Sequence, residues 1–546
     1  MLTSPHSIEQ IEADILIIGS GPVGCTFARQ LIEAGLKVLM VDSGAQLSKR
    51  PGEHLKNSFL YQRNVDLFAS VIRGNIRPLS IPVDARPNLT WDPASFQPNK
   101  PFVRSGQNPD QQEAYNLPGA AATHAIGGMA THWTCATPRQ HPQIERWNVI
   151  QDWDDLYDLA EEYVNTHPRK NRPTHPFSHS VRHQLVMGIL QEEFDELQSP
   201  YQPQPLPLAC ERREDNDEIV VWSGSDTILK PILDEPDKYK DYLTILPEHR
   251  CTKLVTQNGQ IESAEVVDLL GWKTINVKAK KYIICAGTVL TAQVLFNSNI
   301  RPKPLGLYLS EQPLAFCQVV LKQKFIDQIR NGTSPYLDDN AKQRVARHLQ
   351  EGNSEDPIPM PINEPEPQCL IPVSDQRPWH CQIHRDAFAY GDLAPNVDPR
   401  LIVDLRWFGR IKQVPENKVT FSEKYKDTFG MPQPTFHFDY PDLEARTEQH
   451  QMMEDMLRAA SALGGFLPPS EPCFMAPGLT LHIHGLTRMG TSPEDSVTDQ
   501  YSQVWGYPDL YLGGNSMLPV ANASNPTLTS IAVAIHSAKS IIKSLS

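Results

Sequence analysis

The amino-terminal part of the chain alternates between short apolar runs and one amphipathic stretch. The run "DILII", Asp14 to Ile18, has the continuous apolar character of a buried parallel strand. A helix pattern follows from Pro22 to Gly35, with the proline where a first helical turn accepts it. A second apolar run, "KVLMVD", ends in Asp42. This order predicts a β-α-β unit at the start of the folded chain.

Further strands and a long helix are predicted in the remainder of the chain. Lys280 to Gly287, "KKYIICAG", is an apolar strand that ends in a glycine turn, and "PDLYLGGNSMLP" is another that ends in Gly513 and Gly514. Two alternating strands, "RLIVDLRWFGR" and "NKVTFSEK", lie between them, and "NPTLTSIAVAIHSAKSIIKSL" is predicted as the closing helix. The pattern indicates a mixed α/β fold. Because 546 residues exceed what one core supports, we expect two interleaved units.

The loop between the first strand and helix carries the first chemical signal. "GSGPVG" places Gly19, Gly21 and Gly24 in the GxGxxG spacing. In a strand–loop–helix unit these glycines allow a tight turn and close approach to a pyrophosphate, which binds at the helix N-terminus. Asp42 ends the second strand, where an acidic side chain accepts a ribose hydroxyl. The unit predicts a bound dinucleotide. Asp42 disfavours a 2′-phosphate, so FAD or NAD is expected rather than NADP.

Composition and charge restrict the partners and the location. The formal net charge is −14, which repels nucleic acid and anionic membranes, so neither is expected as a partner. No run of about 18 apolar residues predicts a membrane span. The start of the sequence lacks the basic and apolar regions of a signal peptide, and the nine cysteines include no CxxC motif. We therefore expect buried free thiols in a cytoplasmic or non-classically exported protein.

A second glycine-containing stretch, "GGMATHWTCATPR", has no explanation as an ordinary turn. Together with "PWHCQIHRDAFAYG", "MPQPTF", "GLTLHIHGLTRMG" and "ASNPTLTSIAVAI", it resembles the glucose–methanol–choline oxidoreductase family. Within that family the chain is most similar to the enzymes that oxidise pyranose sugars. The resemblance runs from about Asp14 to Ser540 and implies FAD rather than NAD as the cofactor.

The resemblance also implies a covalent flavin and a division into domains. His132 corresponds to the histidine that bonds to the 8α-methyl group of FAD, Gly127 and Gly128 would let the chain lie against the isoalloxazine, and Thr134 would lie near flavin N5. Thr527 is a further cofactor residue. The expected FAD-binding domain comprises 14–60, 115–150, 210–310 and 475–546. The expected substrate domain, a large sheet backed by helices, comprises 151–209 and 311–474, and 73–100 resembles an oligomerisation arm.

The catalytic pair implied by the resemblance is His482 and Asn525. Oxidation of an alcohol requires a base for the hydroxyl proton, and a neutral histidine is suited to that role. His484 is the alternative histidine; on a strand both histidines would point to one face. Asn525, before Pro526, is also an ordinary helix cap, and the two roles are compatible.

The resemblance places the sugar-binding residues mainly in "HCQIHRDAFAYGDLAPN", part of which would be a mobile loop. For Arg406 a structural salt bridge is the alternative, and for Thr134 a backbone-bonded hydroxyl. No residue spacing indicates a metal site. The predicted substrate residues are Gln382, Asp386, Phe388, Tyr390, Arg406 and Thr480.

The expected function is FAD-dependent oxidation of a pyranose such as D-glucose at C2. The 2-keto sugar would form as hydride passes to flavin N5, and O₂, giving H₂O₂, or a quinone would re-oxidise the flavin. A homo-oligomer, tetramer or dimer, is expected. The alternatives are oxidation of glycosides at C3, a redox-silent flavin-binding protein and an NAD dehydrogenase, although the last gives "GGMATHWTCATP" no role.

Overall fold

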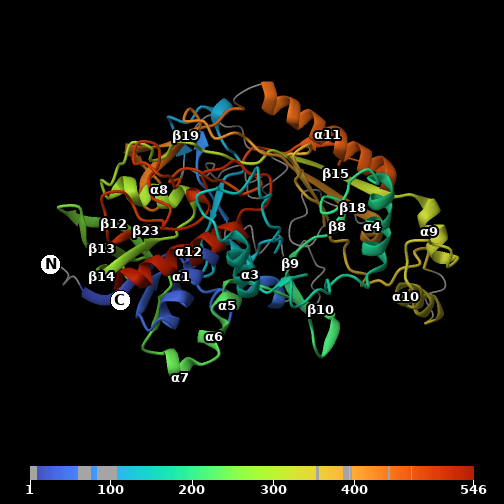
Figure 1. Cartoon of the computed structure of the whole chain (residues 1–546), viewed down its shortest axis with the longest axis horizontal. Coiled ribbons are helices and arrows are strands. Elements are labelled where there is room, and N and C mark those ends of the chain that lie inside the picture. The colour runs from blue at the N-terminus through green and yellow to red at the C-terminus, as the bar shows by residue number, and fades with distance from the viewer. Residues whose placement is uncertain are drawn as a thin grey trace, which may run out of the picture.

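The computed structural model describes residues 9–58, 76–82, 107–351, 356–384, 393, 396–440, 443–468 and 470–545. Two large sheets lie toward opposite ends of the molecule, as Figure 1 shows. The predicted mixed α/β fold is therefore confirmed. Asp386, Phe388 and Tyr390 lie outside the described residues.

The first sheet has the order β11-β2-β1-β14-β13-β12, with β23 also paired to β14. The strands β11, β2, β1, β14 and β23 run parallel, and β12 and β13 extend β14 as an antiparallel arm. Ile15 to Ile18 are all apolar and buried, as is typical of a parallel strand that is covered on both faces. The strands are β1 (Glu9–Ile18), β2 (Val38–Val41), β11 (Leu243–Leu246), β12 (His249–Gln257), β13 (Gln260–Asp268), β14 (Thr274–Ile284) and β23 (Leu510–Leu512).

The two helices that the sequence predicts in this half, α1 and α12, are both present. The helix α1 begins at Pro22 and ends at Glu33, just before Gly35, whose φ of +84° stops it. The closing helix α12 packs against α1, and its start lies beside the glycine loop. The helices of this half are α1 (Pro22–Glu33), α3 (Trp153–Tyr163), α5 (Ser225–Ile228), α6 (Lys230–Leu233), α7 (Pro236–Tyr239), α8 (Thr288–Asn297) and α12 (Thr527–Leu545).

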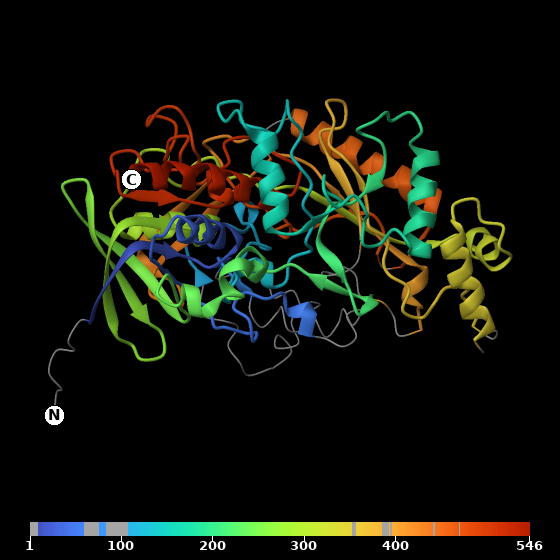
Figure 2. The same ribbon diagram turned by 60° about the horizontal axis from the view of Figure 1, so that its bottom comes forward.

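The second sheet is antiparallel and has the order β21-β15-β18-β17-β16-β8, with β22 also paired to β15. Figures 1 and 2 show α4 and α11 beside it and α9 and α10 at the end of the molecule far from both termini. The elements are β8 (Gln204–Pro205), β15 (Leu314–Leu321), β16 (Cys369–Ile371), β17 (His380–Ile383), β18 (Ile402–Phe408), β21 (Gly464–Phe466), β22 (Cys473–Phe474), α4 (Val181–Glu193), α9 (Gln323–Arg330), α10 (Asp339–Gln350) and α11 (Leu443–Leu463).

Four smaller sheets complete the described part of the fold. They consist of β7 (Thr166–His167) with β9 (Leu208–Arg213) and β10 (Asn216–Trp222), β19 (Lys418–Lys426) with β20 (Pro432–His437), β3 (Ile76–Pro78) with β6 (Ala121–Thr123), and β4 (Ile81–Pro82) with β5 (Gln107–Asn108). Of the expected arm 73–100, only residues 76–82 are described.

The packing differs from the expected domain division at α3 and at β19 and β20, since the last two pack against α8 of the first half. The expected substrate domain begins at residue 151, but α3 packs against α12, and Leu156 and Tyr157 are buried in the core of the first sheet. The second sheet has a core of its own, centred on residues such as Trp407. The boundaries of the two domains stay a prediction.

The cysteines and the helices agree with two sequence-based expectations. All nine cysteines are free thiols, and eight of them are buried. Within the described ranges, every helix is too short or too polar to cross a lipid bilayer.

Candidate active site

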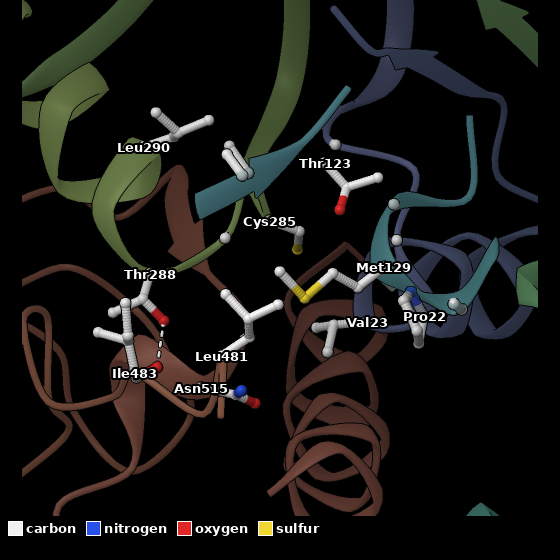
Figure 3. Close-up of a pocket in the computed structure, with 18 of the residues that line it drawn as sticks. Pro22, Val23, Thr123, Met129, Cys285, Thr288, Leu290, Leu481, Ile483 and Asn515 are labelled. Carbon is white, nitrogen blue, oxygen red and sulfur yellow. Dashed lines mark hydrogen bonds between the residues drawn. The ribbon is translucent and has the colours of Figure 1, made fainter. Parts of the chain in front are cut away.

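A cavity of about 300 Å³ lies where the two halves meet. Its lining extends from the glycine loop and Asp42 to Gln382, Arg406 and His482. Figure 3 shows part of the wall between these ends, with Pro22, Val23 and Met129 on one side and Leu481, Ile483 and Thr288 on the other. The Thr288 hydroxyl donates to the Ile483 carbonyl at 2.6 Å, which holds the loop of His482 against α8.

Each glycine of the GxGxxG loop is required for a different physical reason. Gly19 has φ +105°, and a Cβ there would lie 2.3 Å from the Cys285 carbonyl oxygen. A Cβ on Gly24 would lie 2.1 Å from the Gly19 carbonyl oxygen, so this glycine lets α1 pack against the loop. Gly21 has no atom within 4 Å of such a Cβ, lines the cavity and caps the start of α1. These are the turn, packing and ligand-approach roles of a dinucleotide loop.

Asp42 lines the same end of the cavity and also holds the loop. Its Oδ2 accepts from the Ser20 backbone N–H at 2.8 Å and from the Ser20 hydroxyl at 2.7 Å, and its Oδ1 accepts from the Gly44 N–H. Burial raises the pKa of this carboxyl, while the Ser20 donors oppose that shift. Ser20 Oγ in turn accepts from the Gly127 N–H at 2.9 Å, which connects the two glycine-rich segments.

Substituting Gly19 with alanine is expected to abolish FAD binding, because the new methyl group cannot fit beside Cys285 at a positive φ. The matched control is Gly35→Ala, where φ is +84° but no atom lies within 4 Å of the added Cβ. That variant should lose only about 1 kcal/mol of stability and keep its flavin. The measurement is the FAD content of the purified proteins. A fully flavinylated Gly19→Ala protein would contradict the steric explanation.

Gly127 and Gly128 approach protein backbone closely. A Cβ on Gly127, at φ +100°, would lie 2.6 Å from the Cα of Gly52, and one on Gly128 would lie 3.2 Å from the Cα of Gly21. Gly128 lines the cavity, whereas Gly127 does not. In the structure Gly127 therefore serves to pack the segment against Gly52 and Ser20.

His132 follows this turn and is buried in the cavity wall. Its Nε2 lies 2.9 Å from the Thr123 hydroxyl oxygen. Burial lowers the pKa of His132 to about 4, so the imidazole is neutral at neutral pH and has a nitrogen lone pair. Thr134 lines the cavity two residues further on.

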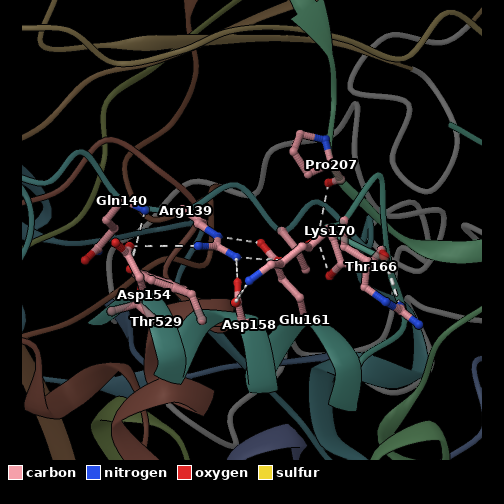
Figure 4. A network of polar contacts seen from close by, with 12 residues as sticks. Arg139, Gln140, Asp154, Asp158, Glu161, Thr166, Lys170, Pro207 and Thr529 are labelled. Carbon is pink, nitrogen blue, oxygen red and sulfur yellow. Dashed lines mark hydrogen bonds and ion pairs between the residues drawn. The ribbon is translucent and has the colours of Figure 1, made fainter. Parts of the chain in front are cut away.

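A network of ion pairs fixes the chain directly after Thr134 (Figure 4). Arg139 donates through Nε to Glu161 at 2.7 Å and through Nη2 to Asp158 at 2.6 Å, both on α3. Tyr157, on the same helix, shares a hydrogen bond of 2.8 Å with Thr529 of α12. The network thus holds the segment of His132 to the helix that begins beside Asn525.

His482 and Asn525 meet at the other end of the cavity. Asn525 Nδ2 lies 3.3 Å from His482 Nε2, and Asn525 Oδ1 accepts a short hydrogen bond from Gln382. Burial, with His484 nearby, lowers the pKa of His482 to about 3, so its imidazole is neutral. His484 does not line the cavity; its Nδ1 lies 3.0 Å from the His482 carbonyl oxygen.

The backbone around His482 and His484 does not form the strand on which both side chains would point to one face. Residues 481–483 are in no strand, and His484 forms only an isolated bridge with Ser310. Leu481 has φ +58° and Gly485 φ +98°, and these left-handed conformations break the alternation of a strand. His482 lines the cavity and His484 does not.

Two polar residues that the sequence did not reveal support His482. The Gln312 side-chain oxygen lies 2.7 Å from His482 Nδ1. The Glu311 carboxylate accepts from the backbone N–H groups of Gln312 and His482 and from the Thr480 hydroxyl. Thr480 thus lines the cavity, but its hydroxyl is donated to Glu311.

Glu311 should make stability depend on pH. Burial raises the pKa of this carboxyl from 4.5 to about 7. The folded state therefore binds more protons than the unfolded state between these values, and the free energy of unfolding should fall as pH rises from about 4.5 to 7. Glu311→Gln should flatten that slope relative to the unmodified protein in denaturant titrations at several pH values. An identical slope in both proteins would contradict the raised pKa.

Gln382 and Arg406, on neighbouring strands, line the cavity beside Asn525. Arg406 also forms an ion pair with Asp404 at 3.5 Å. The salt bridge expected as its alternative role is therefore present, although the side chain also lines the cavity. Phe408 stacks on His380 with ring centroids 4.9 Å apart and reaches to 5.8 Å from His482. The cavity thus combines one flat apolar surface with several polar groups.

The cavity fits FAD on geometric grounds. Gly21, Gly287 and Gly514 all line it, and no atom lies within 4 Å of a Cβ added to any of them, so only their lack of a side chain keeps this space open. Thr527, the first residue of α12, also faces the cavity, as does the start of α1, and helix N-termini favour phosphate. These residues would hold the dinucleotide, with His132 and Thr134 further along.

Comparison with protein families and solved structures defines the class. Residues 12–72 match an FAD binding domain, and residues 414–534 match a GMC oxidoreductase family. The fold is similar to a pyridoxine 4-oxidase from Mesorbium loti, with a TM-score of 0.64, 16% identity and coverage of 97% of this chain and 99% of that one. An Aspergillus oryzae formate oxidase gives a TM-score of 0.63 at 15% identity, with 98% of both chains covered. The molecule is thus an FAD-binding oxidoreductase of the GMC class.

Sequence relatives specify the family. A pyranose 2-oxidase from Lyophyllum shimeji is 39% identical over 97% of this chain and 92% of its own length, and one from Emericella nidulans is 40% identical over 98% and 93%. A C-glycoside 3-oxidase from Arthrobacter globiformis is 30% identical over 97% and 95%. The chain belongs to the pyranose 2-oxidase family.

Proposed function

We propose that this protein oxidises a pyranose sugar, such as D-glucose, at C2 to the 2-keto sugar, and that O₂, giving H₂O₂, or a quinone is the final electron acceptor. The observation that supports it most is the meeting of His482 Nε2 and the Asn525 amide in the cavity wall, 3.3 Å apart. Bound FAD supplies the hydride acceptor. The pyranose 2-oxidase relatives support the substrate class and the C2 position.

The residues around the cavity divide the remaining tasks. His482, neutral because of its burial, accepts the hydroxyl proton at Nε2. Asn525 donates to the hydroxyl oxygen and keeps it in place. Phe408 offers a flat apolar surface to the sugar ring, while Gln382 and Arg406 hydrogen-bond its other hydroxyl groups. Asp386, Phe388 and Tyr390 are proposed to complete the sugar site.

His132 is proposed as the covalent attachment point of the FAD. Its place in the cavity wall and its neutral imidazole support this role. Thr134 is proposed to lie beside the flavin and to steady its reaction with O₂. We further propose a homo-oligomer, a tetramer or dimer, located in the cytoplasm or exported by a non-classical route, consistent with nine free thiols.

Anaerobic mixing with D-glucose tests the function. The flavin absorbance near 450 nm should bleach, and after admission of O₂ the product should carry its carbonyl at C2 by ¹³C NMR. A 3-keto product would instead favour glycoside oxidation at C3, the activity named for the Arthrobacter globiformis relative. A flavin that no sugar bleaches would overturn both.

A further inference from the structure

Gln312 lies in a position that determines which nitrogen of His482 carries the proton. The side chain is buried just before β15, and its amide contacts both catalytic segments. Its Nε2 lies 3.1 Å from the Asn522 carbonyl oxygen, 2.9 Å from Asn522 Oδ1 and 3.0 Å from the Ser524 carbonyl oxygen. Two of these are backbone carbonyls, which only accept hydrogen bonds. The NH₂ group of Gln312 must therefore face the 522–524 segment.

The orientation of the amide fixes the tautomer of His482. The other side of the Gln312 amide is its carbonyl oxygen, 2.7 Å from His482 Nδ1. An amide oxygen only accepts, so Nδ1 must carry a hydrogen. Because the imidazole is neutral, the second nitrogen, Nε2, has the lone pair. Nε2 is the atom that faces Asn525 in the cavity.

We propose that Gln312 is a positioning residue that holds His482 as the Nδ1–H tautomer, so that Nε2 acts as the base toward the sugar hydroxyl. This inference rests on the proposed function of His482. In the opposite tautomer Nε2 would donate a hydrogen bond to the hydroxyl oxygen and could not accept its proton.

The hydrogen bonds around Asn525 are consistent with this tautomer of His482. Gln382 donates to Asn525 Oδ1, which turns the Asn525 NH₂ toward His482 Nε2. A hydroxyl oxygen in the cavity, within hydrogen-bond reach of both groups, would accept from Asn525 and donate its proton to Nε2. The donors and acceptors therefore agree from Gln382 to Gln312 without any conflict.

Glu145 anchors the same segment from the other side. Its carboxylate accepts from the backbone N–H groups of Ala523 and Ser524, at 2.7 and 2.9 Å, and from the Ser524 hydroxyl at 2.7 Å. The segment before Asn525 is thus held independently of Gln312. Loss of the Gln312 amide should consequently act on His482 more than on the place of Asn525.

Two substitutions separate tautomer control from support of the segment. Gln312→Leu removes both the acceptor and the donors. Gln312→Glu keeps an acceptor for Nδ1–H but removes the donors to Asn522 and Ser524, and its negative charge stabilises the imidazolium. Glu311, His484, His380 and Arg406 are the ionisable groups that face His482 or share its part of the cavity, and both variants keep them.

The measurement is the rate of anaerobic flavin reduction against sugar concentration and pH, with whichever sugar reduces the unmodified protein. We expect Gln312→Leu to lower the saturating rate at least about 10-fold, which is a smaller loss than the 10²–10⁴-fold expected when the base itself is removed. The sugar concentration that gives half of the saturating rate should not change. Gln312→Glu should restore most of the rate, and the acid limb of its pH profile should move to higher pH. Gln368→Leu, which removes a buried glutamine outside the cavity wall, is the matched control and should match the unmodified protein.

The outcomes decide between the roles. A Gln312→Leu protein as fast as the unmodified one would overturn the inference while leaving the sugar oxidase function intact. Equal losses in both variants, with an unshifted pH profile, would assign Gln312 to support of the 522–524 segment and also overturn it. If Gln312→Leu does not fold, the acid limb of Gln312→Glu decides alone. Failure of the unmodified protein to be reduced by any sugar would instead reject the proposed function.

Discussion

Replacing His482 with alanine is expected to slow flavin reduction by the sugar about 10²–10⁴-fold, the usual contribution of a positioned acid–base group. The imidazole is neutral in the cavity wall, and no other base adjoins Asn525 in the described part of the cavity that could take its place. Stopped-flow absorbance at 450 nm under anaerobic conditions measures the rate directly.

His484→Ala is the control for this experiment. His484 is fully buried, does not line the cavity and contacts the backbone carbonyl of His482, so its loss should change the rate no more than about threefold, a cost of under 1 kcal/mol. A normal rate in His482→Ala, or a larger loss in His484→Ala than in His482→Ala, would show that His482 is not the base.

Replacing His132 with alanine is expected to convert all of the covalently held flavin into flavin that acid releases. The unmodified protein should retain its yellow colour in the pellet after acid precipitation, whereas the pellet of His132→Ala should be colourless. The variant should still bind FAD before acid treatment, because the glycine loop and Asp42 hold the other end of the dinucleotide.

The matched control for the tether is His482→Ala, which also removes an imidazole from the cavity wall but should leave the flavin in the pellet. Yellow supernatant from the unmodified protein would reject covalent attachment. If the His132→Ala pellet keeps its colour, the flavin is attached through another residue.

The parts of the fold that the sequence predicted are those built from local patterns. The first strand, the helix from Pro22 and the second strand before Asp42 occur as expected, because apolar runs and the glycine spacing specify them within about 30 residues. The place of α3 was not predictable in this way. Its buried face is compatible with either core, and only the contact with α12 assigns it to the first.

The same distinction applies to the site. His482 and Asn525 were expected together through a family resemblance, and the structure brings them to 3.3 Å. Gln312 was missed because its partners are 170 and 210 residues away and nothing in its neighbourhood marks it. The backbone of Leu481 was also missed, since a positive φ at a leucine is imposed by tertiary contacts rather than by local preference.

The most direct test of C2 oxidation is the reduction of the unmodified protein by D-glucose deuterated at single positions. We expect [2-²H]glucose to reduce the flavin several-fold more slowly than unlabelled glucose in single turnover, and [3-²H]glucose to react at the unlabelled rate. A slower reaction with [3-²H]glucose and a normal one with [2-²H]glucose would contradict oxidation at C2.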